Sequence, residues 1–95
     1  MTIRHYKDLT LDEKRSFIQL LLTECEARYY KCNCNLEFLY LGLFDTLRNM
    51  EIIVEWEEIN SAMVVLEQKY RAWRGRIIDA ITESNKQLRY MLDKS

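Results

Sequence analysis

Three cysteines and one histidine are the residues of this chain best suited to bind zinc or to take part in thiol and imidazole chemistry. The cysteines lie at positions 25, 32 and 34, and the histidine is His5. Thiolate and imidazole groups suit zinc, but Cys25 and Cys32 lie two helical turns apart, about 10 Å along one helix. Both could reach one ion only if that helix unwound. We therefore expect no metal site and no cofactor, interpret Cys25 and Cys32 as buried free thiols, and regard Cys34 as the most reactive cysteine.

The same inventory of residues argues against catalysis. A catalytic triad needs a histidine beside a nucleophile, and no serine or cysteine lies at a diagnostic spacing from His5. Phosphate-binding loops need several glycines within a short window, whereas Gly42 and Gly75 are the only glycines of the sequence. We therefore predict that the chain is not an enzyme.

A basic and aromatic segment over residues 69–76 is the strongest candidate for a binding surface. It reads Lys-Tyr-Arg-Ala-Trp-Arg-Gly-Arg, with four positive charges and no acid. Such interleaving can bind single-stranded nucleic acid through phosphate contacts and base stacking. Helical spacing instead places Tyr70 and Trp73 in a packed stripe, with the cationic side chains around them. Arginine, tyrosine and tryptophan are also enriched in the hot spots of protein interfaces, which favours a protein partner over nucleic acid.

Three glutamates, Glu51, Glu55 and Glu58, follow one another at spacings of four and three residues. In a helix this spacing places like charges on one face, where they repel each other unless a basic group lies opposite. We interpret them as a solvated acidic face, with docking of a basic partner as the functional alternative.

Composition and charge describe a globular chain of one domain. The 95 residues are 48% hydrophobic and 31% charged, and the net charge is −1. This balance gives no overall electrostatic attraction to nucleic acid or to an anionic membrane. The apolar stretches resemble neither a signal peptide nor a membrane span, and an odd number of cysteines favours a reducing compartment. We expect a cytoplasmic protein that does not bind membranes.

The elements that must position these residues are helices. We predict an all-α fold, an antiparallel three-helix bundle with helices over residues 11–32, 36–58 and 61–93, after an N-terminal arm of residues 1–9. Thr10 and Glu13 form a capping box at the start of the first helix, and Asn35 and Asn60 are the N-caps of the other two. The apolar stripe of the second helix alternates spacings of four and three residues, which is typical of a buried helical face.

Two alternatives to this layout remain open. The first is a strand over residues 51–56, because three β-branched residues follow Glu51, although no partner strand is evident in the sequence. The second is a helix that continues without a break through Asn60, because the apolar residues before and after it follow the same helical spacing.

The third helix carries a ladder of apolar residues from Ile59 to Ile77, and its phase shifts at Ile81. That shift relaxes left-handed supercoiling, which is typical of a bundle rather than a long coiled coil. The helix is about 50 Å long against about 35 Å for the others, so its C-terminal end should extend beyond them. We expect the arm, a second copy of the chain or a different partner to cover that end.

We therefore predict a non-enzymatic protein that acts through protein–protein interaction, as an inhibitor, an adaptor or an immunity-type modulator. A nucleic-acid-binding accessory protein is the alternative, and a homo-oligomer that uses the same surface is a further expectation. The predicted surface combines the basic segment with the end of the long helix, through Lys69, Tyr70, Arg71, Trp73, Arg74, Arg76, Leu88, Met91 and Leu92.

Overall fold

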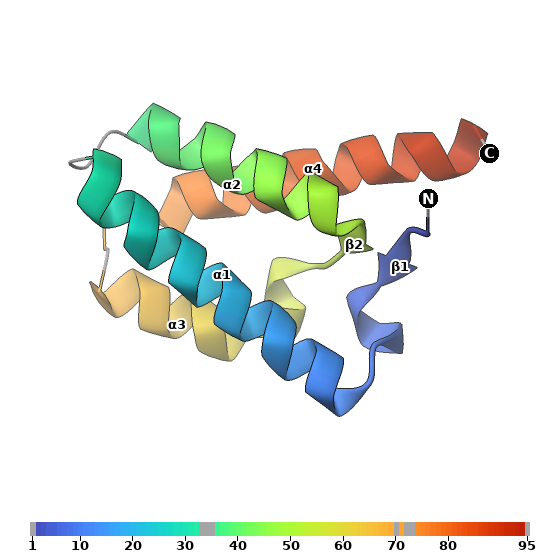
Figure 1. Cartoon of the computed structure of the whole chain (residues 1–95), viewed down its shortest axis with the longest axis horizontal. Helices are drawn as coiled ribbons and strands as arrows, with labels where there is room; N and C mark the ends of the chain where they lie inside the picture. The colour runs from blue at the N-terminus through green and yellow to red at the C-terminus, as the bar shows by residue number, and fades with distance from the viewer. Residues whose placement is uncertain (1, 33–35, 70, 72–73, 95) are drawn as a thin grey trace.

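The computed structural model describes residues 2–32, 36–69, 71 and 74–94, apart from the side chains of residues 30–32. Within this part of the chain four α-helices are found: α1 (Leu11–Cys32), α2 (Leu36–Met50), α3 (Asn60–Lys69) and α4 (Arg74–Lys94) (Figure 1). The shorter elements of the same residues include the strands β1 (Arg4–His5) and β2 (Ile52–Ile53) and the 3₁₀ turns η1 (Tyr6–Asp8) and η2 (Trp56–Ile59). The predicted all-α class is confirmed, but the arrangement of the helices differs from the predicted bundle.

The first helix begins and ends where the sequence predicts. The Thr10 amide donates to the Glu13 carboxylate at 3.0 Å, and the Glu13 amide donates to the Thr10 hydroxyl at 3.2 Å. This reciprocal pair satisfies two amides that the first turn of a helix otherwise leaves without partners. Phe17, Leu21 and Cys25, spaced by four residues, form the buried face of α1.

The second helix ends at Met50, so the predicted helix over residues 36–58 is wrong in its last eight residues. Glu51 has a φ of 59°, in the left-handed region, and its amide donates to the carbonyl of Arg48 at 3.1 Å. A left-handed residue directly after the last turn is a common helix terminator. The β-branched residues that follow it favour an extended backbone. We call residues 51–59 the linker.

The strand alternative is confirmed in a short form, and its partner is the N-terminal arm. β1 and β2 pair in parallel, with Arg4 opposite Ile52 and His5 opposite Ile53. The Arg4 amide donates to the carbonyl of Glu51 at 2.9 Å, and the Thr2 amide donates to the Glu51 carboxylate at 2.9 Å. The arm is therefore part of the folded structure and holds the start of the linker.

The 3₁₀ turn η2 leads directly into α3, and Asn60 itself has helical dihedral angles. Asn60 is therefore not the N-cap that the sequence predicts. The Glu55 amide donates to the carboxylate of Glu58 at 2.9 Å, which is the reach-back contact of a capping box. Helical backbone thus continues through Asn60, but it begins only at Trp56.

Two separate helices, α3 and α4, take the place of the single helix predicted over residues 61–93. α3 packs on α1, whereas α4 packs along α2 and on β2 (Figure 1). One straight helix could not reach both sets of neighbours, so packing overrides the continuous apolar spacing. Residues 70, 72 and 73, between the two helices, lie outside the described residues.

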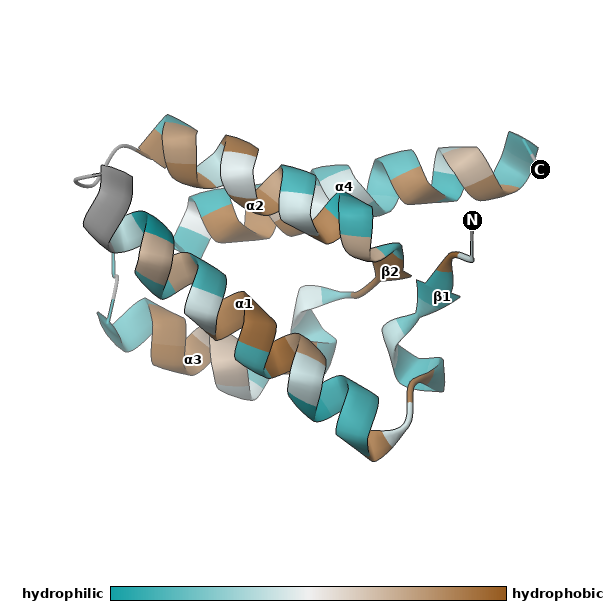
Figure 2. Ribbon diagram, viewed as in Figure 1, coloured by the Kyte–Doolittle hydropathy of each residue, from teal (hydrophilic) through white to brown (hydrophobic). Residues whose placement is uncertain are grey.

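The main helix pair, α2 and α4, is parallel and not antiparallel as predicted. Near the start of both helices Glu37 pairs with Arg76 at 2.7 Å, and farther along the chain Val54 bonds to Asn85. The core between and around them is apolar, and hydrophobic residues concentrate in β2 and the middle of α1 (Figure 2). Its most buried members include Leu39, Leu43, Ile53, Met63, Ile77, Ile81 and Leu88.

Candidate protein-binding surfaces

The arginine at the start of α4, Arg76, is paired within the chain. Its guanidinium lies 2.7 Å from the Glu37 carboxylate and 3.1 Å from the Asp79 carboxylate. It also stacks over the Tyr40 ring, with 4.2 Å between the guanidinium carbon and the ring centroid. These contacts connect α2 to α4. They also neutralise the positive charge of Arg76, which binding of a phosphate at this position would require.

Arg74, the other described arginine of this turn, is engaged in a similar way. Its Nε atom lies 3.1 Å from the Glu67 carboxylate, as an ion pair without hydrogen-bond geometry, and its guanidinium lies 5.5 Å from the centroid of the Trp56 ring. Lys69 and Arg71 are exposed. Tyr70 and Trp73 lie outside the described residues, so their placement in the core stripe stays a prediction.

The C-terminal end of α4 (residues 89–94), which we call the α4 end, extends beyond α2 (Figure 1). Met91 is half-buried, and Leu92 is 38% exposed. Leu88, just before this end, is fully buried, so it belongs to the core and is not the exposed anchor that the sequence predicts. Tyr90, which is absent from the predicted surface, is 61% exposed, and the Lys94 ammonium lies 4.9 Å from its ring centroid. In the sequence, the position of Tyr90 outside the apolar stripe of this helix was the signal that could have indicated its exposure.

The two halves of the predicted surface lie at opposite ends of α4. Fifteen residues separate Arg76 from Met91, which corresponds to about 22 Å along the helix axis. A single compact contact patch therefore does not include both. Each end has to be considered as a separate surface.

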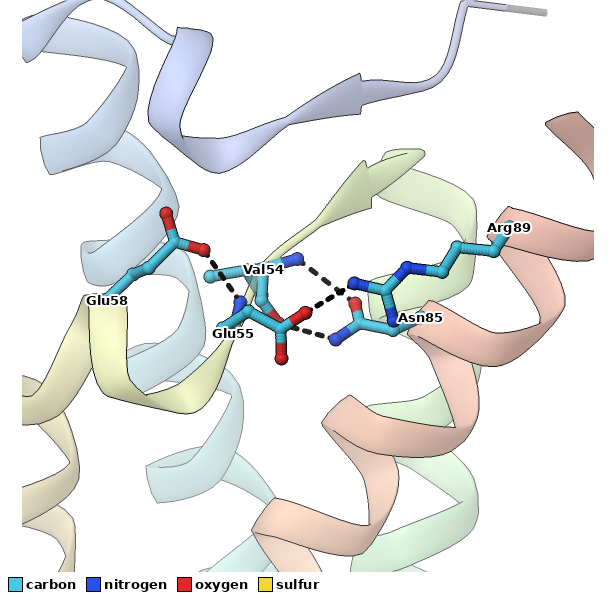
Figure 3. A network of polar contacts seen from close by, with 5 residues as sticks. All are labelled: Val54, Glu55, Glu58, Asn85 and Arg89. Atoms are coloured by element: carbon cyan, nitrogen blue, oxygen red, sulfur yellow. Dashed lines mark hydrogen bonds and ion pairs between the residues drawn. The ribbon is translucent and has the colours of Figure 1, made fainter.

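A polar network fixes the base of the α4 end to the linker (Figure 3). The buried Asn85 side chain accepts from the Val54 amide at 3.0 Å and donates to the Val54 carbonyl at 2.6 Å. One turn later, Arg89 forms an ion pair with Glu55, whose amide in turn donates to Glu58. Asn85 thereby gives an irregular segment the backbone partners that a neighbouring strand would otherwise supply.

The three glutamates of the linker do not form one acidic helix face. Glu51 directly follows α2, Glu55 is the N-cap of η2, and Glu58 lies within that turn. Glu51 accepts the amide of Thr2, and Glu55 pairs with Arg89. The predicted acidic helix face is therefore wrong, because it assumed that the helix continued to residue 58.

The outer face of α2 exposes two large apolar side chains that the predicted site does not contain. Phe38 is 61% exposed and Leu41 is 55% exposed, on the side opposite the buried Leu39 and Leu43. The signal in the sequence was their position out of phase with the buried stripe. Exposed apolar residues that gather on one face often mark interaction sites.

Cys25 is buried in the core, and this burial raises the pKa of its thiol to about 12. A thiol with so high a pKa remains protonated and unreactive near neutral pH. The Cys32 side chain and Cys34 lie outside the described residues, so their predicted roles stay predictions. Among the described residues, no cluster of histidine, cysteine and carboxylate side chains has a metal-binding arrangement.

No described helix combines the length and the apolar character that crossing a membrane requires. A scan of protein-family models returned no match to this chain, and searches of characterised proteins and of solved structures also returned none. Function is therefore inferred from the residues and their geometry.

Proposed function

We propose that this chain acts by binding another protein, without catalysing a reaction, and that the α4 end is its main contact surface. The observation that carries this proposal is the exposure of Tyr90 and Leu92 on a helix end that extends beyond its neighbours (Figure 1). Tyrosine supplies a large contact area at a low cost in conformational entropy, which is why it is common among interface hot spots. Arg89 and Lys94 surround these apolar side chains with charge, as in the polar rim of an interface.

The attachment of α4 to the linker supports this proposal. Asn85 and Arg89 hold the base of the α4 end through the contacts with Val54 and Glu55. A surface that is already ordered loses less entropy on binding than a flexible one. The α4 end thus has both the exposed anchors and the rigid support that a protein-binding helix needs.

The nucleic-acid alternative receives less support from the same contacts. Arg74 and Arg76 pair with the carboxylates of Glu67, Glu37 and Asp79. Binding a phosphate through these arginines would require breaking those ion pairs or sharing them with an anion of the same sign as the carboxylates. Arg74 and Arg76 then function in holding α3, α4 and α2 together.

The role that we propose is that of a small inhibitor, adaptor or immunity-type modulator in the cytoplasm. A reducing compartment is supported by the odd number of cysteines and by the burial of Cys25 as a free thiol. Self-association is proposed as a second property of the chain, because a small domain gains stability from it.

Affinity capture from native cell lysate tests the proposal with three proteins: the tagged wild-type chain, the double variant Tyr90→Glu/Leu92→Glu and the control Leu11→Glu. Leu11 is 64% exposed at the start of α1, so the control adds a charge far from the α4 end. We expect the wild type and the control to recover the same protein partner, and the double variant to lose it. Circular dichroism should show the same helical content for all three.

Two results would contradict the proposal. One is a partner that all three proteins recover equally, which would place the contact elsewhere. The other is a complex that disappears after nuclease treatment and weakens steeply with salt, which would favour the nucleic-acid alternative.

A further inference from the structure

The second half of α4 has one face that points away from the core and continues into the α4 end. Its residues recur at spacings of three and four, opposite the buried Ile81 and Leu88. Glu83 on this face is half-buried and the other members are exposed. We call this set the outer face of α4, and it consists of Glu83, Lys86, Gln87, Tyr90, Asp93 and Lys94.

A groove of about 470 Å³ lies on this face, and the described residues that line it all belong to α4. Four of them, at positions 83, 86, 87 and 90, relate as i, i+3, i+4 and i+7. This is the outline of a hole in knobs-into-holes packing, which receives a side chain from a facing helix. Tyr90, at one corner of the hole, is 61% exposed. The face therefore contains both a projecting side chain and a hole.

The projecting side chain and the hole fit each other in an antiparallel pair of α4 helices. If the two-fold axis passes between residues 88 and 89, Tyr90 of each copy lies opposite Gln87 of the other, over the centre of the hole. A two-fold interface requires this kind of self-complementarity within one surface. The apolar side of the hole is Met91, which is half-buried and lines the same groove.

The charges of the outer face of α4 match the same antiparallel arrangement. Glu83 lies opposite Lys94 of the second copy, and Lys86 lies within one turn of its Asp93. The two-fold axis repeats each of these pairs. A parallel arrangement would instead place each charge beside its own kind and align the two helix dipoles.

These four charged side chains are available for such pairs. Among the residues that the structure describes, none of them has an ion-pair partner. Lys94 contacts the Tyr90 ring of its own chain, and this contact leaves the ammonium group exposed to a carboxylate. A second copy thus supplies four ion pairs that the single chain does not form.

We propose that a second copy of the chain binds to the outer face of α4, antiparallel, with Tyr90 of each copy in the hole formed by residues 83, 86, 87 and 90 of the other. This inference rests on the proposed function, because it takes the α4 end to be a contact surface. Since both use Tyr90, a second copy and a partner protein exclude each other. Self-association then covers the contact surface until a partner displaces it.

The length of the contact determines the expected strength of the dimer. The two helices overlap over residues 83–94, which corresponds to about 18 Å of helix. One helix face of this length buries less than the ~800 Å² per partner of a standard stable interface. We therefore expect a weak, reversible dimer with a dissociation constant above about 1 μM.

Sedimentation equilibrium of the full chain, from low micromolar to millimolar concentration, tests the charge pairing. We expect the wild type to show a monomer–dimer equilibrium. Glu83→Lys should weaken dimerisation about tenfold, because it replaces two attractive contacts with two repulsive ones. The charge swap Glu83→Lys/Lys94→Glu should restore it to within about threefold of the wild type. The control Glu26→Lys makes the same change of charge at an exposed position of α1 and should dimerise like the wild type.

Crosslinking tests the orientation of the two helices. In a Cys32→Ser/Cys34→Ser background, Gln87→Cys should give a covalent dimer with a short thiol crosslinker, because residue 87 lies near the two-fold axis. Thr82→Cys, at an exposed position of the same helix, should give none, because an antiparallel pair separates the two thiols by about 20 Å. A parallel pair would crosslink at both positions.

Four results would overturn this inference. They are a wild type that stays monomeric throughout, a Glu83→Lys variant that dimerises as tightly as the wild type, a charge swap that dimerises no better than Glu83→Lys, and equal crosslinking at residues 82 and 87. The two proposals can also fail separately. A chain that captures a partner from lysate but stays monomeric contradicts only this inference, whereas a dimer with these properties that captures no partner contradicts only the proposed function.

Discussion

The linker and the outer face of α2 lie next to each other in the chain but use their apolar residues in opposite ways. The linker is short and irregular, yet Ile52, Ile53 and Val54 are all buried and its polar groups bond to the arm and to α4. α2 is regular, yet it exposes Phe38 and Leu41. The irregular backbone of the linker is ordered by specific contacts with other segments. The helical backbone of α2 satisfies its own hydrogen bonds, so the side chains on its outer face are not needed to hold it in place.

The largest effect should come from cutting the attachment of the linker to α4. Asn85→Leu removes both partners of Val54 and leaves a buried amide and a buried carbonyl without hydrogen bonds. We expect the free energy of unfolding to fall by about 3 kcal/mol, measured by urea denaturation. A fall below about 1 kcal/mol would show that water or another group replaces Asn85.

The neighbouring Ser84 provides a matched comparison, because it is also buried but its hydroxyl has no hydrogen-bond partner in the described structure. Ser84→Ala removes an unsatisfied polar group and should raise the free energy of unfolding by about 0.5–1 kcal/mol. The same urea experiment measures it. A destabilised variant would reveal a hydrogen bond of Ser84 that operates in solution.

The two glycines should respond differently to alanine. Gly75 is exposed, and apart from its chain neighbours and its own helix backbone no atom lies within 4 Å of the position that a Cβ would occupy. Gly75→Ala should therefore stabilise the chain by about 0.5 kcal/mol through helix propensity. Gly42→Ala must displace the Arg28 guanidinium, so we expect it to be no more stable than the wild type. Thermal unfolding of both variants measures the difference, and equal stabilisation would show that Arg28 moves at no cost.

Truncation of the outer face of α2 should hardly affect the stability of the monomer. Phe38→Ser changes a side chain that is already 61% exposed, so at concentrations where the chain is monomeric we expect a change within about 0.5 kcal/mol. Urea denaturation of the dilute protein measures it. A loss above about 1 kcal/mol would mean that Phe38 supports the fold, and the contrast with the linker would disappear.

The smallest effect concerns the arm, and it depends on pH. The Thr10 amide and then the Arg4 guanidinium, 2.5 Å away, hold the pKa of Glu13 down to about 2. Because the unfolded pKa is near 4.5, this contribution to stability is present above about pH 4.5 and is lost as the pH falls towards 2. Glu13→Gln should be slightly less stable than the wild type at neutral pH, with a difference that closes on acidification. A difference that stays constant from pH 7 to 2 would rule out the charge as its cause.

Local signals in the sequence predicted local features of the fold. Thr10 and Glu13 fixed the start of α1, and the apolar spacing placed Cys25 in the core. The end of α2 was missed because Glu51 adopts a left-handed backbone that carries no sequence signature outside glycine and asparagine. Because the apolar residues keep a helical spacing through residues 51–81, the sequence predicted continuous helix there. It therefore indicated neither the linker nor the separation of α3 from α4.

The candidate site shows the same limit. Sequence reasoning identified the basic segment, but the partners of Arg76 include Glu37, 39 residues away, and such pairing follows from the tertiary packing of α2 on α4. The exposure of Tyr90, Phe38 and Leu41 was predictable in principle, because each lies off the buried stripe of its helix. Whether an off-stripe apolar residue is exposed still depends on which elements cover the helix.

The pairing of β1 with β2 has a consequence for the order in which the chain folds. The contact between Thr2 and Glu51 closes a segment of 49 residues, and that closure costs chain entropy before any hydrogen bond compensates for it. α1 and α2 can form from local contacts alone, so the arm docks late and should detach first. In native-state hydrogen exchange, the amides of Arg4 and Thr2 should therefore exchange well before those in the middle of α4, as one small cooperative unit that opens while the helices stay folded.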